Sequence, residues 1–204
     1  RKQHLVPFTE YFPYEKELPW LYELLLANDY KWWEVGEEAT VFEYNGLKLS
    51  TPICFEDTFG ALNAEFVANG AEVLLNLSND FWSQALQAEL QHYQLAVFRA
   101  VENRKPLLRS TNSGITCMVD VTGKTYGILP PFEKAWGIYE MELYEDQGLT
   151  FYTRHPDLFG KLHVALAALS VALGISLKIS SPIIRRRKER KDREERLSHL
   201  FEGM

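Results

Sequence analysis

Alternating and periodic hydrophobic positions divide much of the chain into short strands and helices. Apolar and polar residues alternate over 46–53, which predicts a half-buried strand, and apolar residues then recur at helical spacing until Gly70. A nearly continuous apolar run predicts a buried strand at 72–77, and further strands are predicted at 107–110, 116–120 and 125–129. A 3.6-residue period predicts a helix over 86–103 with one apolar stripe: Leu86, Leu90, Tyr93, Val97 and Val101. The alternation of helices and strands predicts an α/β domain with helices packed on a sheet.

Residues 11–44 have no regular period, and only 18–26 could form a short helix. The segment contains two prolines and many aromatic residues, among them Trp20, Trp32 and Trp33. A long irregular segment in a compact domain is often a functional lid, and Tyr and Trp suit a membrane–water interface. A hydrophobic loop packed on its own domain is the alternative. If the domain lies against a bilayer, we expect acyl chains to enter here.

Residues 158–179 are apolar on every face of a helix. Such a helix is roughly 33 Å long, enough to cross a hydrocarbon core of about 30 Å. We therefore predict a transmembrane helix at 158–181, with a buried core helix as the alternative, and one globular domain over 1–157.

The tail at 182–204 carries a basic block, which placed directly after an apolar span predicts a cytoplasmic flank and no nucleic-acid site. Residues 185–204 hold 8 Lys and Arg and 5 Asp and Glu, which leaves 14 and 23 for residues 1–184, a net charge of −9. An acidic domain followed by a basic tail is typical of a protein that crosses a bacterial inner membrane, with the domain in the periplasm.

Cys54 lies where the first predicted strand passes into a helix. The free N–H groups at such a junction favour a thiolate and the oxyanion of an acyl adduct, so Cys54 is a candidate nucleophile, and Glu56 could orient the site or a proton. The alternative is a small buried residue, since free cysteine is commonly buried and inert. Cys117 is predicted to be a packed strand residue. The two cysteines form no metal-ligand spacing, although a disulfide between them stays open in an oxidising compartment.

Lys2 and Glu10 flank an apolar run with a proline, which favours an extended segment. Together they could supply the cation and the proton acceptor that a cysteine nucleophile needs, although without Cys54 they would be ordinary solvated charges. His92 is predicted on a helix surface, with no spacing that pairs it with Cys54.

Five motifs follow one another along the chain: Lys2-x-x-Leu5-Val6-Pro7-Phe8-x-Glu10, Ile53-Cys54-Phe55-Glu56, Asn76-Leu77-Ser78-Asn79-Asp80-Phe81-Trp82, Arg99-Ala100-x-Glu102-Asn103 and Arg109-x-Thr111-Asn112-x-Gly114. In order and spacing they resemble the motifs of apolipoprotein N-acyltransferases, which are membrane members of the nitrilase (carbon–nitrogen hydrolase) superfamily. The resemblance extends from Arg1 to about Arg196. It implies a nitrilase-like αββα sandwich, incomplete at the N-terminus and followed by one C-terminal transmembrane helix.

The resemblance implies acyl transfer in two steps. The acyl group first moves from a phospholipid, by this resemblance phosphatidylethanolamine, to Cys54, where it forms a thioester. It then moves to the N-terminal diacylglyceryl-cysteine of a lipoprotein. In the mechanism that the resemblance implies, Lys2 and the backbone N–H of Phe55 stabilise the oxyanion. Glu10 and Glu56 have supporting roles, Glu10 near Lys2 and the path of the proton and Glu56 at the turn that bears Cys54. Loops at strand ends are expected to bind substrate, together with the aromatic segment: Asn79, Asp80, Trp82, Asn112 and Trp20. We expect no cofactor, no metal and a monomer.

The family's triad includes a glutamate upstream of the lysine motif, and Arg1 already lies inside that motif. We therefore expect the chain to be the C-terminal part of a longer protein and to be inactive alone. Three departures from the family pattern occur, at Thr9, at Phe55 and at the run Phe81-Trp82-Ser83-Gln84. A nitrilase-type amidase with a membrane anchor and an inactive scaffold are the alternatives.

Overall fold

The structure is a computed structural model that describes residues 1–143 and 148–178. Two compact units are distinguished, one over Arg1–Pro156 and one from Asp157 onward. The first unit contains the sheet, its helices and every candidate site residue. The basic tail at 182–204 and the end of the predicted span lie outside the described residues.

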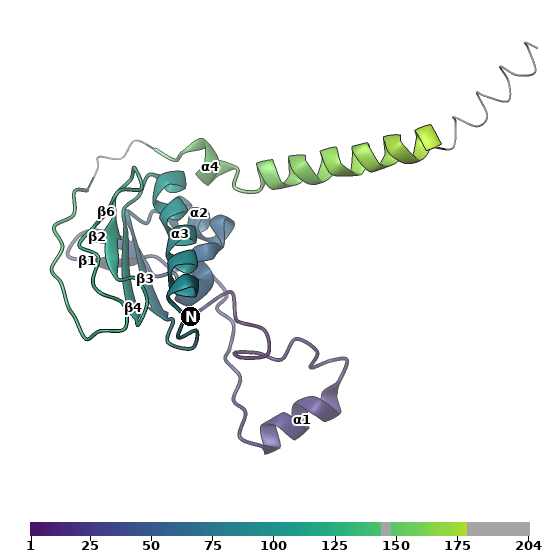
Figure 1. Ribbon diagram of the computed structural model, residues 1–204, viewed down its shortest axis with the longest axis horizontal. Coiled ribbons are helices and arrows are strands. Elements are labelled where there is room, and N and C mark those ends of the chain that lie inside the picture. The colour runs from purple at the N-terminus through teal and green to yellow at the C-terminus, as the bar shows by residue number, and fades with distance from the viewer. Residues whose placement is uncertain (144–147, 179–204) are drawn as a thin grey trace, which may run out of the picture. The chain divides into compact units, whose positions relative to one another are not determined.

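A single six-stranded mixed sheet forms the centre of the first unit, in the order β1-β2-β3-β4-β5-β6 (Figure 1). Its middle strands β2, β3 and β4 are parallel, and the outer strands pair antiparallel. The strands are β1 (Phe42–Tyr44), β2 (Leu47–Ser50), β3 (Val73–Asn79), β4 (Leu107–Asn112), β5 (Cys117–Val119) and β6 (Thr125–Tyr126). The predicted α/β class is confirmed, and the described residues supply one sheet with its helix layer.

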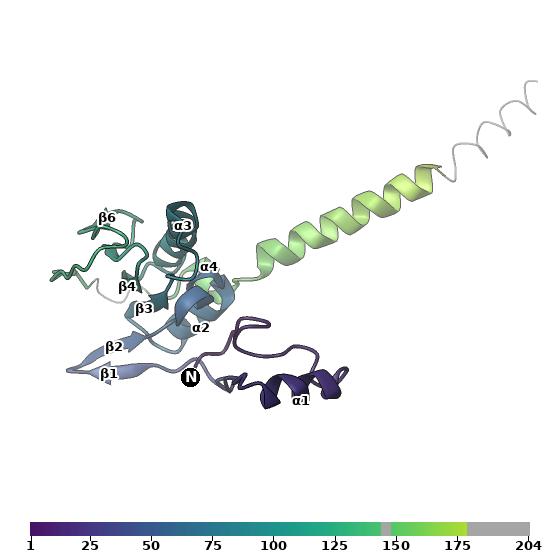
Figure 2. The same cartoon turned by 60° about the horizontal axis from the view of Figure 1, so that its bottom comes forward.

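Helices α2 (Gly60–Ala68) and α3 (Leu86–Asn103) pack on the same face of this sheet. A short 3₁₀ helix, η1 (Cys54–Thr58), precedes α2, and α4 (Phe151–Arg154) follows the sheet. The long irregular segment projects from the sheet and contains α1 (Pro19–Ala27), as predicted for 18–26 (Figure 2).

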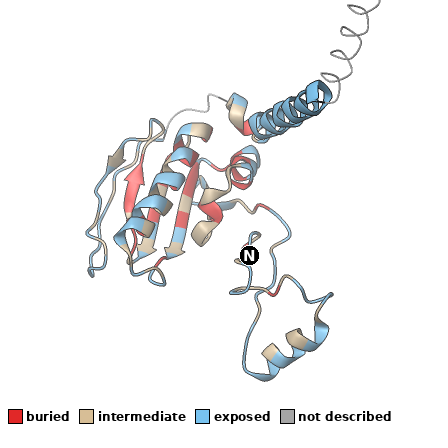
Figure 3. Ribbon diagram, turned by 45° about the vertical axis from the view of Figure 1, so that its right-hand side comes forward, coloured by how far each residue is buried: buried red, intermediate tan, exposed pale blue. Residues whose placement is uncertain are grey.

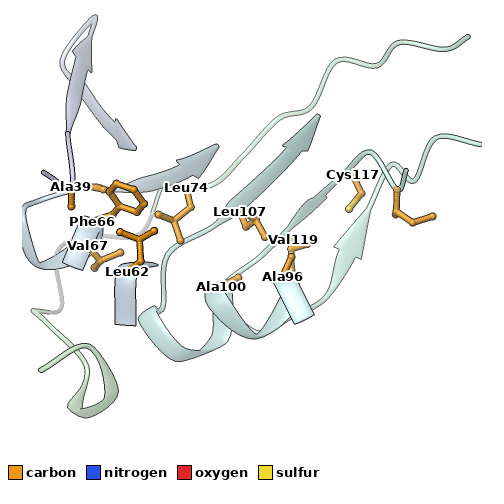
Figure 4. Packing of buried hydrophobic residues seen from close by; sticks show 12 residues of the cluster. Ala39, Leu62, Phe66, Val67, Leu74, Ala96, Ala100, Leu107, Cys117 and Val119 are labelled. Carbon is orange, nitrogen blue, oxygen red and sulfur yellow. The ribbon is translucent and has the colours of Figure 1, made fainter. Parts of the chain in front are cut away.

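The hydrophobic core lies between the sheet and these two helices. Leu62, Phe66 and Val67 of α2 meet Leu74 of β3, while small residues of α3 contact the later strands (Figure 4). Cys117 is fully buried in this core, and both cysteines are free thiols, so the disulfide left open by the sequence does not form here.

The predicted bounds of α3 are confirmed, but the prediction of its buried stripe is wrong. Leu86, Leu90 and Val101 are 42%, 42% and 43% exposed, and only Tyr93 and Val97 reach the edge of the core. The face that packs on the sheet contains Ala96 and Ala100, both fully buried, and several polar residues. Short side chains let the helix approach the sheet closely, and the polar ones find partners there.

The predicted strands differ in extent from those of the structure, and one strand was not predicted. The strand expected at 46–53 ends at Ser50, the one expected at 125–129 ends at Tyr126, and β1 was not predicted. β1 joins β2 through Asn45 and Gly46, both with positive φ (50° and 80°), as a tight hairpin turn requires.

The second unit contains a helix over Leu158–Lys178 with a mean hydropathy of 1.8. By length and composition this helix could cross a membrane, and none of its apolar window is buried within its own unit. Figure 3 shows buried positions in the sheet and on the helices that cover it, whereas this helix is exposed along its length.

Candidate active site

Cys54 is the first residue of η1 and lies on the sharp turn that joins the sheet to this helix. Its φ of +56° is in the left-handed region, which is costly for a residue with a side chain and persists only where neighbouring contacts impose it. Asn76, fully buried on β3, imposes it here by donating from Nδ2 to the carbonyl oxygens of Cys54 (2.9 Å) and Pro52 (3.1 Å). The turn is therefore held by a neighbouring strand.

The helix that begins at Cys54 is shorter than the sequence suggested. It is a 3₁₀ helix of five residues, so the dipole of a long helix does not act on the thiol. The backbone N–H of Phe55 makes no hydrogen bond to any described residue. It is available as the oxyanion donor that the resemblance implies.

Glu56 joins the Cys54 turn to the N-terminal segment. Its buried carboxylate accepts from the backbone N–H of Ile53 (2.7 Å) at one oxygen, and from those of Gln3 (2.6 Å) and His4 (3.0 Å) at the other. Residues 50 positions apart in the chain are therefore fixed to one carboxyl group. The position of Lys2 beside the turn depends on this bridge.

Lys2 and Glu10 form a shielded ion pair. The Lys2 ammonium lies 2.8 and 2.6 Å from the two Glu10 oxygens, and Glu10 also accepts from the backbone N–H of Val6 (2.8 Å). The Lys2 nitrogen is 4.9 Å from the ring centroid of Phe55, the residue that follows Cys54. The structure thus brings the cation, the carboxylate and the thiol-bearing turn into one region.

Cys54 lines a cavity of about 1030 Å³ with mainly apolar walls, to which Glu10 and Trp33 contribute. A second cavity of about 580 Å³ shares Glu10, Trp33 and Ile53 with the first, and Lys2 lines it. The first cavity is at the upper end of the range for ligand sites, and its apolar walls suit a hydrocarbon chain.

The predicted substrate-binding residues divide into two groups. Asn79 and Asn112 end the adjacent strands β3 and β4, hydrogen-bond to each other (3.2 Å), and line the large cavity with Trp82. Asp80 is buried and does not line that cavity, and Trp20, 65% exposed on α1, lines none of the cavities described here. The structure therefore does not bring Trp20 to the Cys54 turn.

A buried ionic cluster behind the turn was missed by the sequence analysis. Arg109 of β4 pairs with Asp57 of η1, and the ring nitrogens of His92 lie 2.8 Å from Asp57 and 3.1 Å from Asp80. The prediction that His92 is a helix-surface residue is wrong: its side chain is 15% exposed. Burial by itself lowers the pKa of His92, but the hydrogen bonds to the two carboxylates outweigh this and raise the pKa to about 9.

Comparison with known proteins shows which family the chain belongs to. The family model described as carbon-nitrogen hydrolase matches residues 1–145. The chain belongs to the carbon–nitrogen hydrolase family. This confirms the superfamily that the five motifs resemble.

This carbon–nitrogen hydrolase chain is similar to proteins named apolipoprotein N-acyltransferase. It is 45% identical to apolipoprotein N-acyltransferase 1 of Treponema denticola over 171 residues, which are 84% of this chain and 31% of the relative. It is 37% identical to apolipoprotein N-acyltransferase of Thermotoga maritima over 171 residues, 83% of this chain and 33% of the relative. The chain thus spans about a third of the length of these relatives.

Solved structures of the superfamily are more distant. An amidase from Nesterenkonia sp. matches 49% of this chain and 40% of its own with 21% identity and a TM-score of 0.43. A carbon–nitrogen hydrolase from Helicobacter pylori matches 50% and 43% with 14% identity and a TM-score of 0.45.

Proposed function

We propose that the protein containing this chain transfers an acyl group from a phospholipid to the N-terminal amine of a diacylglyceryl-cysteine on a lipoprotein. The observation that carries the proposal is the position of Cys54, on a strained turn at a large apolar cavity beside the shielded Lys2–Glu10 pair. The names of the relatives support the same activity. Phosphatidylethanolamine is the proposed donor.

In the first step the Cys54 thiolate attacks the ester carbonyl carbon of the phospholipid. A C–S bond forms, and the carbonyl oxygen becomes an oxyanion that the N–H of Phe55 and the ammonium of Lys2 stabilise. Losing one such donor typically costs about 3–4 kcal/mol of barrier. The ester C–O bond then breaks, and the lysophospholipid oxygen leaves with the proton that the thiol gave up.

A carboxylate must carry this proton. By resemblance to the family the carrier is a glutamate upstream of the lysine motif. Glu10, which binds both Lys2 and the backbone of its own segment, holds the ammonium in place and lies on the path of the proton. Glu56 keeps the two segments together.

In the second step the amine of the lipoprotein attacks the thioester. The new C–N bond forms as the C–S bond breaks, the thiolate of Cys54 is restored, and the amine gives up its proton to the carboxylate. Amines attack thioesters readily because thiolate is a good leaving group. The product is an N-acylated lipoprotein.

The proposed location is the bacterial inner membrane. The helix Leu158–Lys178 is long and apolar enough to span a bilayer, and we assign 158–181 to the span and 1–157 to a periplasmic domain. The basic residues of 182–204 then flank the cytoplasmic side. Exposed aromatic residues around α1, such as Trp20 and Trp33, suit contact with lipid headgroups.

The experiment incubates the full-length protein with labelled phospholipid and a diacylglyceryl-cysteine peptide. Labelled N-acyl peptide is the expected product, whereas release of free fatty acid alone would assign the chain to a hydrolase of the amidase type. Cys54→Ser should abolish the hydroxylamine-labile acyl adduct. Cys117→Ala, which removes the other thiol from the core, should retain it. An adduct at the wild-type level in Cys54→Ser would refute Cys54 as the acyl carrier.

A further inference from the structure

Five ionisable side chains from four parts of the fold meet behind the Cys54 turn. Asp57 belongs to η1, Arg109 to β4, Glu89 and His92 to α3, and Asp80 follows β3 directly. Asp57 and Arg109 are fully buried, and Asp80 and Glu89 are nearly so. Charges this deep are stable only when each has a partner.

The hydrogen bonds fix the protonation state of His92. Its Nε2 faces an Asp57 oxygen at 2.8 Å and its Nδ1 faces an Asp80 oxygen at 3.1 Å. Arg109 donates to the other oxygen of Asp57 and lies 3.5 Å from Asp80. Burial raises the pKa of Asp80, but the hydrogen bonds from His92 and Ser78 and the charges of His92 and Arg109 outweigh this and lower it. An ionised carboxylate only accepts hydrogen bonds, so a ring nitrogen that faces one carries a proton, in agreement with the raised pKa of His92. His92 is therefore an imidazolium.

Glu89 is the remaining member of the cluster and lies beside Asp80. Burial raises the pKa of Glu89, the hydrogen bond donated by Ser83 (2.6 Å) lowers it, and the charge of nearby Asp80 raises it further, with a net rise. A Cβ added to Gly114 would lie 2.5 Å from Asp80 and 2.9 Å from Glu89, so backbone closes this side of the cluster. Arg109 and the imidazolium are the two cations that contact Asp57 and Asp80, so a neutral His92 would leave these two carboxylates with one cation.

The cluster connects parts of the fold that surround the thiol. Asp57 is three residues after Cys54, and Asp80 is two residues before Trp82, which lines the large cavity. A smaller cavity of about 230 Å³ is lined by Cys54, Trp82, Asp80 and His92 together. The imidazolium is the only described side chain that hydrogen-bonds both Asp57 and Asp80.

We propose that His92, as a partly buried imidazolium that bridges Asp57 and Asp80, is a positioning residue that holds the Cys54 turn and the loop bearing Trp82 in the geometry for acyl transfer. The expected effect of His92 on the rate of acyl transfer rests on the proposed function. The structural part of the proposal, that both ring nitrogens of His92 are protonated, does not depend on the proposed function.

The kinetic test uses His92→Gln in the full-length protein. The amide has a similar reach but no charge, so acyl-enzyme formation from labelled phospholipid should slow about 10- to 100-fold with KM for the phospholipid unchanged. His155→Gln, which changes an exposed histidine outside the cluster, should keep the wild-type rate. A wild-type rate in His92→Gln would overturn the proposal.

A charge-balanced double variant separates positioning by charge from simple packing. In Asp80→Asn/His92→Gln the unpaired carboxylate is gone, so the rate should recover about fivefold or more over His92→Gln. A double variant no faster than His92→Gln would overturn the charge-based role, because two packing defects do not repair each other.

The structural part is tested on the wild-type protein, so it needs no variant that folds and no acyl transfer. The pH dependence of hydrogen–deuterium exchange at the Cε1–H of each histidine, followed by mass spectrometry, gives the protonation midpoint of each ring. His92 should have a midpoint near 9. A midpoint at or below the ordinary value of about 6.5 would refute the imidazolium, whatever reaction the protein catalyses.

Discussion

Glu56→Gln tests whether one buried carboxylate joins the two segments of the active site. Glu56 accepts three backbone N–H bonds, from Gln3, His4 and Ile53, and is 1% exposed. Glutamine keeps one acceptor oxygen, but its NH₂ group must face at least one of these N–H groups. A hydrogen bond to a charged group is worth about 1.5–3 kcal/mol, and a buried unpaired donor costs about 1–3 kcal/mol. We therefore expect a loss of about 3–5 kcal/mol in the free energy of unfolding.

For a domain of this size each kcal/mol shifts the melting temperature by about 2–4 °C, so Glu56→Gln should melt about 6–20 °C lower. Thermal unfolding of the full-length protein in detergent measures this. Glu65→Gln, which makes the same change at an exposed position of α2, is the matched control. Because the N-terminal segment carries Lys2, a displacement of about 1 Å should also slow acylation of Cys54 about 100-fold. Melting within about 2 °C of the Glu65→Gln control, with wild-type acylation, would refute this reasoning.

Three further predictions concern charge and thiol chemistry. Lys2→Met should slow acyl-enzyme formation about 10²- to 10³-fold by removing an oxyanion donor, and wild-type kinetics would contradict that role. Because His92 has its pKa raised from 6.5 to about 9, its stabilisation is complete below pH 6.5 and is lost as the pH rises through 9. Unfolding scans from pH 6 to 10 should show a loss of about 3 kcal/mol that is absent in His92→Gln; a wild-type free energy that rises over this range would contradict it. Iodoacetamide at pH 8 should label Cys54, which lines a cavity, and spare Cys117, whose pKa burial raises to about 11; equal labelling in peptide mass spectra would refute this.

The hydrophobic pattern predicted where helices and strands occur better than it predicted which side of a helix is buried. The bounds of α3 follow from its period, but its apolar stripe is largely exposed and its buried face is a second stripe of small and polar residues. This second stripe, Glu89, His92, Ala96, Arg99 and Asn103, also recurs at helical spacing and was visible in the sequence. Hydropathy alone ranks it as the solvent side, because hydropathy does not record that a charge can be paired inside the fold.

By itself the sequence determined the α/β class, the family and the identities of the groups that carry the proposed chemistry, because these depend on local periodicity and on motifs that are contiguous in the chain. Only the tertiary structure decided how Lys2 and Cys54 come into one region, since Glu56 and Asn76 act across about 50 and 22 positions of sequence. It also decided that His92, Asp57, Asp80 and Arg109 form one ionic cluster. Pairing of buried charges depends on which strands and helices become neighbours, and no local pattern of residues specifies that.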